Sequence, residues 1–270
     1  MTIRPLLAAA FLLVSLAPRL RADTPPDILK TAVSASKSSD AAVRNQAAQD
    51  LGATRDPKAV PALAALLKDE NAYVRQSAAT ALLFIPDSAA TEALGRALDD
   101  KTASVRHAAI RGLGKHRATG AAPRVAALLT APDPAERKLA AAALGDMGAK
   151  DSVPALQSVL ADADEGVRVQ AASSLAKLGD KSGAAAAAAA LKSRDASARA
   201  QAAAALGLAG DAASLAAVEA ALKGEKDANA KGMMEFARAQ LKARLGVKDK
   251  PATKAPAKTP APAPTKRPKK

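Results

Sequence analysis

The sequence repeats itself with a period of 31 residues, and this repetition restricts the fold more than any other feature. Each period contains one arginine, an alanine three residues later and a leucine seven residues later. The ladder arginines are Arg44, Arg75, Arg106, Arg137, Arg168 and Arg199, and the leucines are Leu51, Leu82, Leu113, Leu144, Leu175 and Leu206. A unit this small can bury its apolar face only against neighbouring units, so the period predicts a stacked array.

Each period reads as two helices. Val105, Ala108, Ala109 and Leu113 have the spacing of one helical stripe. Helix-capping side chains stand four residues before the ladder arginines, at Asp40, Asn71, Thr102, Asp133, Asp164 and Asp195. Glycines eight residues after four of the arginines predict helix stops, at Gly52, Gly114, Gly145 and Gly207. A second set of caps, at Asp56, Asp87, Asp180 and Asp211, begins the second helices. We therefore expect two helices of about 12 residues per repeat.

The composition supports an all-α protein. The chain has four aromatic residues among 270, with no Trp and no Cys. A β-sandwich needs bulky side chains that this chain lacks. Disulfide scaffolds, cysteine-ligated metals and thiol catalysis are excluded because there is no Cys.

The pattern D-x-x-V-R-x-x-A-A-x-x-L-G, complete in residues 40–52 and less complete in residues 164–176, resembles the HEAT-like repeats of the bilin-lyase type. The resemblance covers six repeats, over residues 39–223. It implies a right-handed α-solenoid in which the second helices line the recognition surface. We expect terminal capping helices over residues 27–36 and 231–245. The second of these presents an apolar face and stops at Gly246, and the face consists of Met233, Phe236, Ala237, Leu241 and Leu245.

The arginine ladder has two interpretations. Six guanidinium groups in a row could bind an anionic polymer. Alternatively, each arginine pairs with the capping aspartate four residues earlier or with an acid of the next repeat, and the recurrence of acids with the same period favours this structural role. Asn71 and Thr102 carry no charge, so Arg75 and Arg106 are expected to be the most available for other contacts.

The sequence predicts no catalytic, cofactor-binding or metal site. His107 and His116 lack the spacing of metal ligands and are expected at the surface. Possible partner contacts are the single tyrosine, Tyr73, and outward positions of the second helices, Lys68, Arg96 and Gln157. The segment 84–86, Phe-Ile-Pro, replaces a glycine-containing turn and is expected to pack locally.

The N-terminus predicts export. Residues 1–22 combine a short basic segment with an uncharged apolar run, and Leu20, Arg21 and Ala22 form an imperfect cleavage site. We interpret this segment as a signal peptide and expect a periplasmic or secreted protein. A cytoplasmic protein with an apolar N-terminal helix, or an uncleaved anchor, remains the alternative.

The C-terminus carries much of the positive charge. The net charge of the chain is +14, and residues 246–270 contain seven lysines and one arginine against one aspartate. Residues 250–270 consist only of Lys, Arg, Pro, Ala and Thr, which predicts a disordered basic tail. The tail could bind an anionic envelope polymer, a lipid surface or nucleic acid, or it could only increase solubility.

We therefore predict three segments, a signal peptide at 1–22, a solenoid at 23–245 and a tail at 246–270. The predicted function is a non-enzymatic scaffold or adaptor, monomeric and exported, that binds a protein or peptide. Two alternatives stay open. One is an enzyme or enzyme subunit resembling bilin lyases, and the other is nucleic-acid binding through the basic tail, which the nearly neutral body disfavours.

Overall fold

The computed structural model describes residues 26–247. The predicted signal peptide, its cleavage site and the basic tail beyond Val247 lie outside the described residues. Within residues 26–247 every regular element is a helix, which confirms the all-α prediction. The chain divides into two compact units at residue 125, and each unit contains stacked helix pairs.

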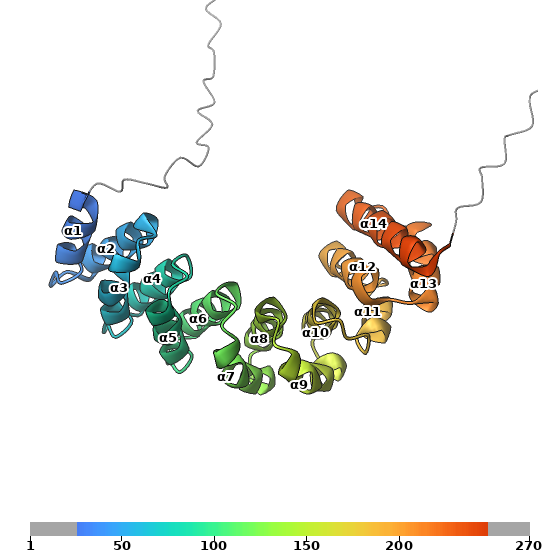
Figure 1. The fold of residues 1–270 in the computed structure, drawn as a ribbon, viewed down its shortest axis with the longest axis horizontal. Coiled ribbons are helices and arrows are strands. Elements are labelled where there is room, and N and C mark those ends of the chain that lie inside the picture. The colour runs from blue at the N-terminus through green and yellow to red at the C-terminus, as the bar shows by residue number, and fades with distance from the viewer. Residues whose placement is uncertain (1–25, 248–270) are drawn as a thin grey trace, which may run out of the picture. The chain divides into compact units, whose positions relative to one another are not determined.

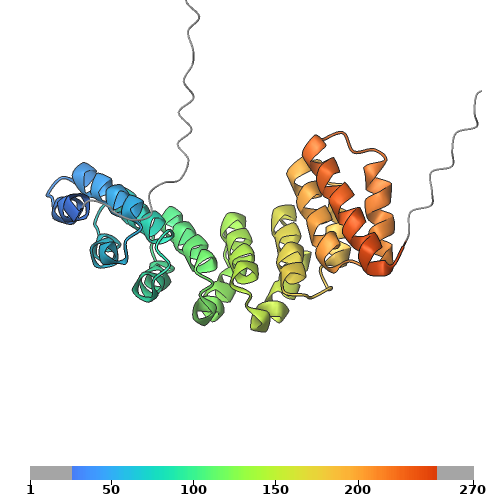
Figure 2. The ribbon, with the colours of Figure 1, turned by 45° about the horizontal axis from the view of Figure 1, so that its top comes forward.

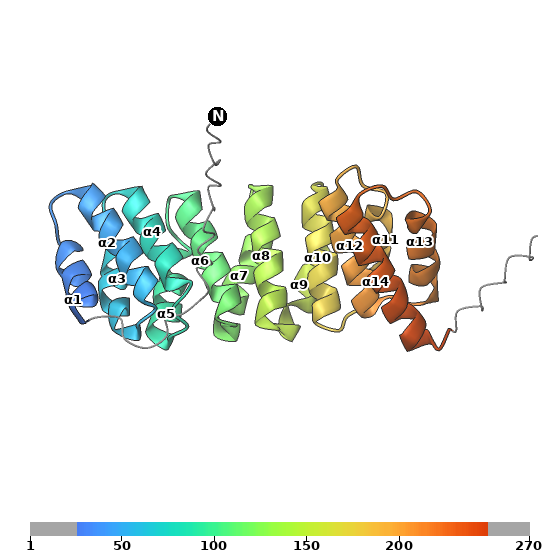
Figure 3. The same ribbon diagram turned by 90° about the horizontal axis from the view of Figure 1, so that it is seen from above.

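In unit 1, helix α1 (Pro26–Ala35) packs on the first helix of the first repeat. The helices that carry ladder arginines lie in one row, and the helices that follow them lie in another (Figures 1 and 3). We call these rows the first-helix layer and the second-helix layer. The first-helix layer contains α2 (Ala41–Thr54), α4 (Ala72–Leu82) and α6 (Ala103–Lys115), and the second-helix layer contains α3 (Val60–Leu66), α5 (Ser88–Ala97) and the start of α7 (Ala122–Ala127).

Unit 2 repeats the arrangement. Its first-helix layer contains α8 (Pro134–Met147), α10 (Glu165–Lys177) and α12 (Ala196–Ala209), and its second-helix layer contains α9 (Val153–Ser158), α11 (Ala184–Ala190) and α13 (Ala212–Leu222). The terminal helix α14 (Ala228–Leu245) packs on both α12 and α13 (Figure 2).

Most second helices are shorter than the predicted length. Helix α3 has 7 residues and α9 has 6, and each is preceded by a 3₁₀ turn, at Pro57–Ala59 and Lys150–Ser152. If the 3₁₀ turn and the following helix formed one continuous α-helix, the proline in the first turn of α3 or α9 would have to donate a backbone hydrogen bond. Proline has no N–H group, so this bond cannot form. The second-helix layer is therefore built from short pieces.

The predicted capping residues begin the first helices. Asp40 accepts a hydrogen bond from the Ala42 N–H at 2.8 Å, and Asn71 accepts one from the Tyr73 N–H at 2.9 Å. Thr102 is the exception, because its side chain makes no capping hydrogen bond.

The glycines predicted to stop the first helices instead lie inside them. Helix α2 continues past Gly52 to Thr54, and the residue that ends it is Arg55, in the left-handed conformation at φ 52°. A Cβ atom at Gly52 would lie 2.6 Å from the Cβ of Ala81 on α4. Gly145 and Gly207 are equally close to α10 and α14. These glycines therefore allow neighbouring first helices to approach closely.

Leucine and alanine form the cores of both units. The leucine seven residues after each ladder arginine is at most 1% exposed in all six repeats. A second column is also buried throughout, and it comprises Leu63, Leu94, Val125, Leu156, Ala187 and Val218. The periodic columns are thus the interior of the stack, as the sequence predicts.

Helix α14 is a first helix shifted by one residue. Its cap, Asp227, follows Asp195 by 32 residues, so Lys231 takes the ladder position. The buried residues are Ala230, Met234, Ala237 and Leu241. The predicted apolar face is therefore partly wrong, because Phe236 is 57% and Leu245 is 38% exposed. Gly246, at φ 67°, ends the helix as predicted.

Candidate functional site

The ladder arginines connect successive repeats within a unit. The Arg44 guanidinium donates to both carboxylate oxygens of Asp69, at 2.6 and 2.9 Å. Its Nη1 donates to the carbonyl oxygens of Ser38 and Ser39, at 3.0 and 2.9 Å. One side chain thus donates hydrogen bonds to carbonyl groups in the turn before its own helix and to a carboxylate in the turn before the next first helix.

The same arrangement recurs along the ladder. The further pairs are Arg75 with Asp100, Arg137 with Asp162 and Arg199 with Glu225. The acids are not the capping aspartates but the residues two positions before the next cap. Hydrogen bonds from the arginines lower the pKa of Asp69 and Asp162 and bring the pKa of Glu225 to about 2. These guanidinium groups are bound within the fold.

Arg75 is not available for other contacts, contrary to the expectation from its uncharged cap. It is 5% exposed, and besides Asp100 it donates to the hydroxyl of Thr102 at 3.0 Å. Thr102, which does not cap its helix, therefore serves as an acceptor for the previous ladder arginine. Arg106 donates to the Asp100 carbonyl at 2.9 Å.

The structure brings only two of the predicted partner contacts together. Lys68 and Arg96 line one hollow of about 190 Å³ between α3 and α5, next to Asp99 and Asp100. Gln157, in unit 2, donates to the Ser182 hydroxyl at 3.1 Å. Tyr73 lies on α4 and therefore belongs to the first-helix layer.

The aromatic side chains mark the first-helix layer. Tyr73 is 75% exposed, Phe84 is 40% exposed and Phe236 is 57% exposed. No other aromatic residue occurs between residues 26 and 247, so the cores of both units are formed without aromatic side chains. Large aromatic side chains favour burial, and exposed ones are enriched at recognition surfaces. Tyr73 lies on α4 and Phe84 directly after α4 in unit 1, and Phe236 lies on α14 in unit 2.

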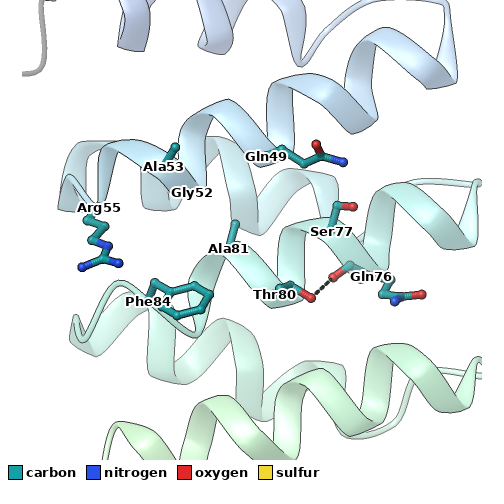
Figure 4. A pocket seen from close by; sticks show the side chains of 9 residues that line it. All are labelled: Gln49, Gly52, Ala53, Arg55, Gln76, Ser77, Thr80, Ala81 and Phe84. Carbon is teal, nitrogen blue, oxygen red and sulfur yellow. Dashed lines mark hydrogen bonds between the residues drawn. The ribbon is translucent and has the colours of Figure 1, made fainter. Parts of the chain in front are cut away.

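A hollow of about 650 Å³ lies between the exposed faces of α2 and α4 (Figure 4). We call it the α2–α4 hollow. Its lining residues are Gln49, Gly52, Ala53, Arg55, Gln76, Ser77, Thr80, Ala81 and Phe84. Gly52 and Ala81 are in close contact at the floor of the hollow. Because both side chains are small, the two helices approach closely and the space over this contact stays unfilled.

The two ends of the α2–α4 hollow differ in chemistry (Figure 4). Gln49, Gln76 and Ser77 lie at one end, and Arg55 and Phe84 lie at the other. Ser77 donates to Asn45 at 2.7 Å and Thr80 donates to the Gln76 carbonyl at 2.9 Å. Within residues 26–247, the side-chain amides of Gln49 and Gln76, which line the hollow, make no hydrogen bond to the protein.

Phe84 contacts two cations from neighbouring repeats. The Lys115 ammonium lies 4.1 Å from the centre of the ring, and the Arg55 guanidinium carbon lies 5.7 Å from it. Both distances are within the range of cation–π attraction. The expectation that residues 84–86 pack locally therefore holds for Ile85, which is 1% exposed, but not for Phe84.

His116, next to Lys115 in the chain, is half-buried rather than exposed. Its Nδ1 lies 3.0 Å from the Thr91 hydroxyl, and its Nε2 is buried without a hydrogen-bond partner. Burial lowers the pKa of His116. His107 is also half-buried, so the predicted surface location is wrong for both histidines.

Comparison with known proteins identifies the repeat. The family model of HEAT repeats matches residues 28–114, 91–176 and 153–237, which together cover most of the chain. The chain belongs to the HEAT-repeat family. No curated protein matches this HEAT-repeat sequence. Within residues 26–247, none of the helices is both long and apolar enough to cross a lipid bilayer.

Solved structures with the same fold include two natural proteins. The complex of CpcE and CpcF of phycocyanin lyase from Nostoc sp. PCC7120 is 24% identical, with a TM-score of 0.56, and the match covers 83% of this chain and 99% of that chain. YibA of E. coli is 21% identical, with a TM-score of 0.61 over 81% of this chain and 82% of that chain. At these identities the similarity concerns the fold.

The predicted contacts did not include the residues of the α2–α4 hollow. One signal was present, because the position at the end of the first helix is Gly148, Gly179 or Gly210 in the three HEAT repeats of unit 2 but Arg55 or Arg117 in two repeats of unit 1. A non-glycine residue in the left-handed conformation costs about 1 kcal/mol. An arginine at such a position is a local exception that sequence comparison between repeats can find.

Proposed function

We propose that this HEAT-repeat protein is a binding scaffold that recognises a partner polypeptide on its first-helix layer. The exposure of Tyr73 on α4 and of Phe84 directly after it, both in unit 1, carries the proposal. Aromatic side chains in exposed positions supply most of the binding free energy at many protein interfaces.

The α2–α4 hollow supports a specific contact region in unit 1. Tyr73, Gln76, Thr80 and Phe84 have the spacing of a single stripe along α4 and the residues after it, with the hollow beside the stripe. An extended segment along this stripe would reach amide groups, hydroxyl groups and an aromatic ring. The scaffold would bind through this surface, and the arginine ladder would keep the repeats of each unit in register.

The test compares the two layers directly. A pull-down from an envelope extract would use the full chain, a Tyr73→Ser/Phe84→Ser variant and a Lys68→Ala/Arg96→Ala variant. We expect the first variant to lose about 90% or more of the captured partner, because an aromatic hot spot contributes about 2 kcal/mol. The second variant, altered in the second-helix layer, should keep it. Loss of the partner only in the second variant would place recognition on the other layer and refute the proposal.

Export and the basic tail are part of the same proposal. The N-terminal segment supports delivery to the periplasm or the medium, and the seven lysines of residues 246–270 support a second, salt-sensitive attachment to an anionic envelope component. Mass spectrometry of the mature protein from an envelope fraction would test export. An N-terminus at Asp23 would support it, and a cytoplasmic chain that retains Met1 would refute it.

A further inference from the structure

The one charged side chain among the residues that line the α2–α4 hollow is cationic. No acidic residue lines it, and α4 contains none. Two acids on the neighbouring segment are engaged within the fold. Asp50 accepts a hydrogen bond from the Gln46 amide at 2.9 Å, and Asp56 caps the following 3₁₀ turn. Arg55 is exposed at the rim and has no carboxylate partner among residues 26–247.

Arg55 and Lys115 form a cationic rim around an aromatic surface. The two residues come from repeats on either side of Phe84, and their cationic groups lie 5.7 and 4.1 Å from the ring. Lys115 is exposed and ends α6. Arg55 and Phe84 line this end of the hollow, and Lys115 lies against Phe84 beside it, so a ligand segment at this end meets two positive charges and an apolar surface.

The opposite end of the hollow suits a peptide backbone. Gln49 and Gln76 each offer a donor and an acceptor, which match the alternating N–H and C=O groups of an extended chain. A polynucleotide would instead require a continuous row of cations along its phosphates, whereas the cations here are confined to one end.

We infer that the α2–α4 hollow and the cationic rim beside it bind an acidic peptide segment, with carboxylates at Arg55 and at Lys115 on either side of Phe84 and a neighbouring apolar side chain against that ring. The inference rests on the proposed function, because it specifies the chemistry of the partner on the first-helix layer.

A reporter at the hollow can separate this site from the basic tail. The chain has no Cys, so Thr80→Cys in the full chain provides a single attachment point for an environment-sensitive dye. Ser197→Cys, at an exposed position on α12 in unit 2, is the matched control. The probes are a short peptide of alternating glutamate and leucine and the same peptide with glutamine in place of glutamate.

We expect the glutamate peptide to change the dye signal at position 80 in a saturable way and to leave position 197 unaffected. The glutamine peptide should bind about tenfold or more weakly, and so should the glutamate peptide to Arg55→Gln or Lys115→Gln, because charge-assisted hydrogen bonds are lost. Lys177→Gln, the equivalent of Lys115 two repeats later, removes the same net charge and should bind as the parent does.

Three results would overturn the inference. Equal binding of both peptides at position 80 would refute the acidic specificity and leave the proposed polypeptide surface intact. Equal loss of binding in Lys177→Gln and Arg55→Gln would show that the loss comes from the change in net charge and not from a contact at the hollow. Tighter binding of oligothymidylate than of the glutamate peptide at position 80 would assign the hollow to nucleic acid. A failure of the proposed function itself would appear separately, as retention of the partner by the Tyr73→Ser/Phe84→Ser variant.

Discussion

At the scale of single residues, the ladder arginines stabilise the stack through the turns rather than through the helices. Arg75 and Arg199, for example, each bind an acid 25 or 26 residues further along the chain, and the same guanidinium group binds carbonyls five and six residues before it. Because guanidinium is planar and offers five donors, a single side chain can serve both turns. Lysine could not reproduce this geometry.

Removal of the most buried ladder arginine tests this role. Arg75→Ala leaves Asp100 and two carbonyl groups without their donor, and we expect a loss of about 3 kcal/mol in the free energy of unfolding. Lys177→Ala, which breaks an exposed ion pair with Asp146, should cost less than about 1 kcal/mol. Urea denaturation measures both. Similar small losses for the two variants would show that the ladder does not stabilise the stack.

His116 makes the stability depend on pH in a mildly acidic range. Burial lowers its pKa in the folded state, so the unfolded chain binds the proton more readily. The free energy of unfolding should therefore have its full value above the ordinary histidine pKa of 6.5, and it should decrease as the pH falls below that value. The pKa values of Asp69, Asp162 and Glu225 are also lowered in the folded state, so protonation of these carboxylates destabilises the fold too. This loss begins only when the pH falls below the ordinary pKa of a carboxyl group.

Thermal melting at pH 7.5 and at pH 5.5 measures this dependence. We expect the parent chain to lose more stability between these values than His116→Gln does, because glutamine does not titrate. The same decrease in both proteins would show that His116 is not the group responsible.

At the scale of helices, the glycine column sets the distance between neighbouring first helices. A Cβ at Gly52 would lie 2.6 Å from the Ala81 Cβ and 2.9 Å from the Ala81 Cα, so the backbone of α4 would have to move. In the interior of most helices, an alanine stabilises the helix by about 1 kcal/mol relative to a glycine. The contact between α2 and α4 reverses this preference.

Two glycine substitutions with opposite expected signs test the column. Gly52→Ala should destabilise unit 1 by about 1 to 3 kcal/mol through overpacking. Gly232→Ala, in α14 where an added Cβ meets nothing within 4 Å, should stabilise the protein by about 0.5 to 1 kcal/mol. Chemical denaturation of both variants is the measurement. Stabilisation by Gly52→Ala would mean that the helices can separate at little cost.

At the scale of the whole molecule, stability is a sum of local contributions. Within each unit the repeats pack on their sequence neighbours, and α1 closes one end of unit 1 while α14 closes one end of unit 2. Such an architecture does not depend on residues beyond its terminal helices.

Deletion of residues 248–270 tests this independence together with the charge argument. We expect the melting temperature to stay nearly constant, because the tail contains none of the buried columns. Retention on a cation exchanger near neutral pH should be largely lost, since the deletion removes seven lysines and one arginine against one aspartate. A truncated protein that binds the resin as strongly would place the effective charge in the helical region.

The sequence by itself determined the period, the starts of the first helices and the buried columns, because each of these depends on spacing within one repeat. Of the second caps, Asp87 and Asp211 begin α5 and α13, whereas α3 and α11 begin after Ala59 and Gly183. The partner of each ladder arginine, the role of Gly52, the exposed stripe of α14 and the α2–α4 hollow were decided only by the tertiary structure. All four depend on how closely and in which register one repeat packs on the next. That distance follows from side chains about 30 residues apart, such as Gly52 and Ala81, whose contact no local pattern encodes.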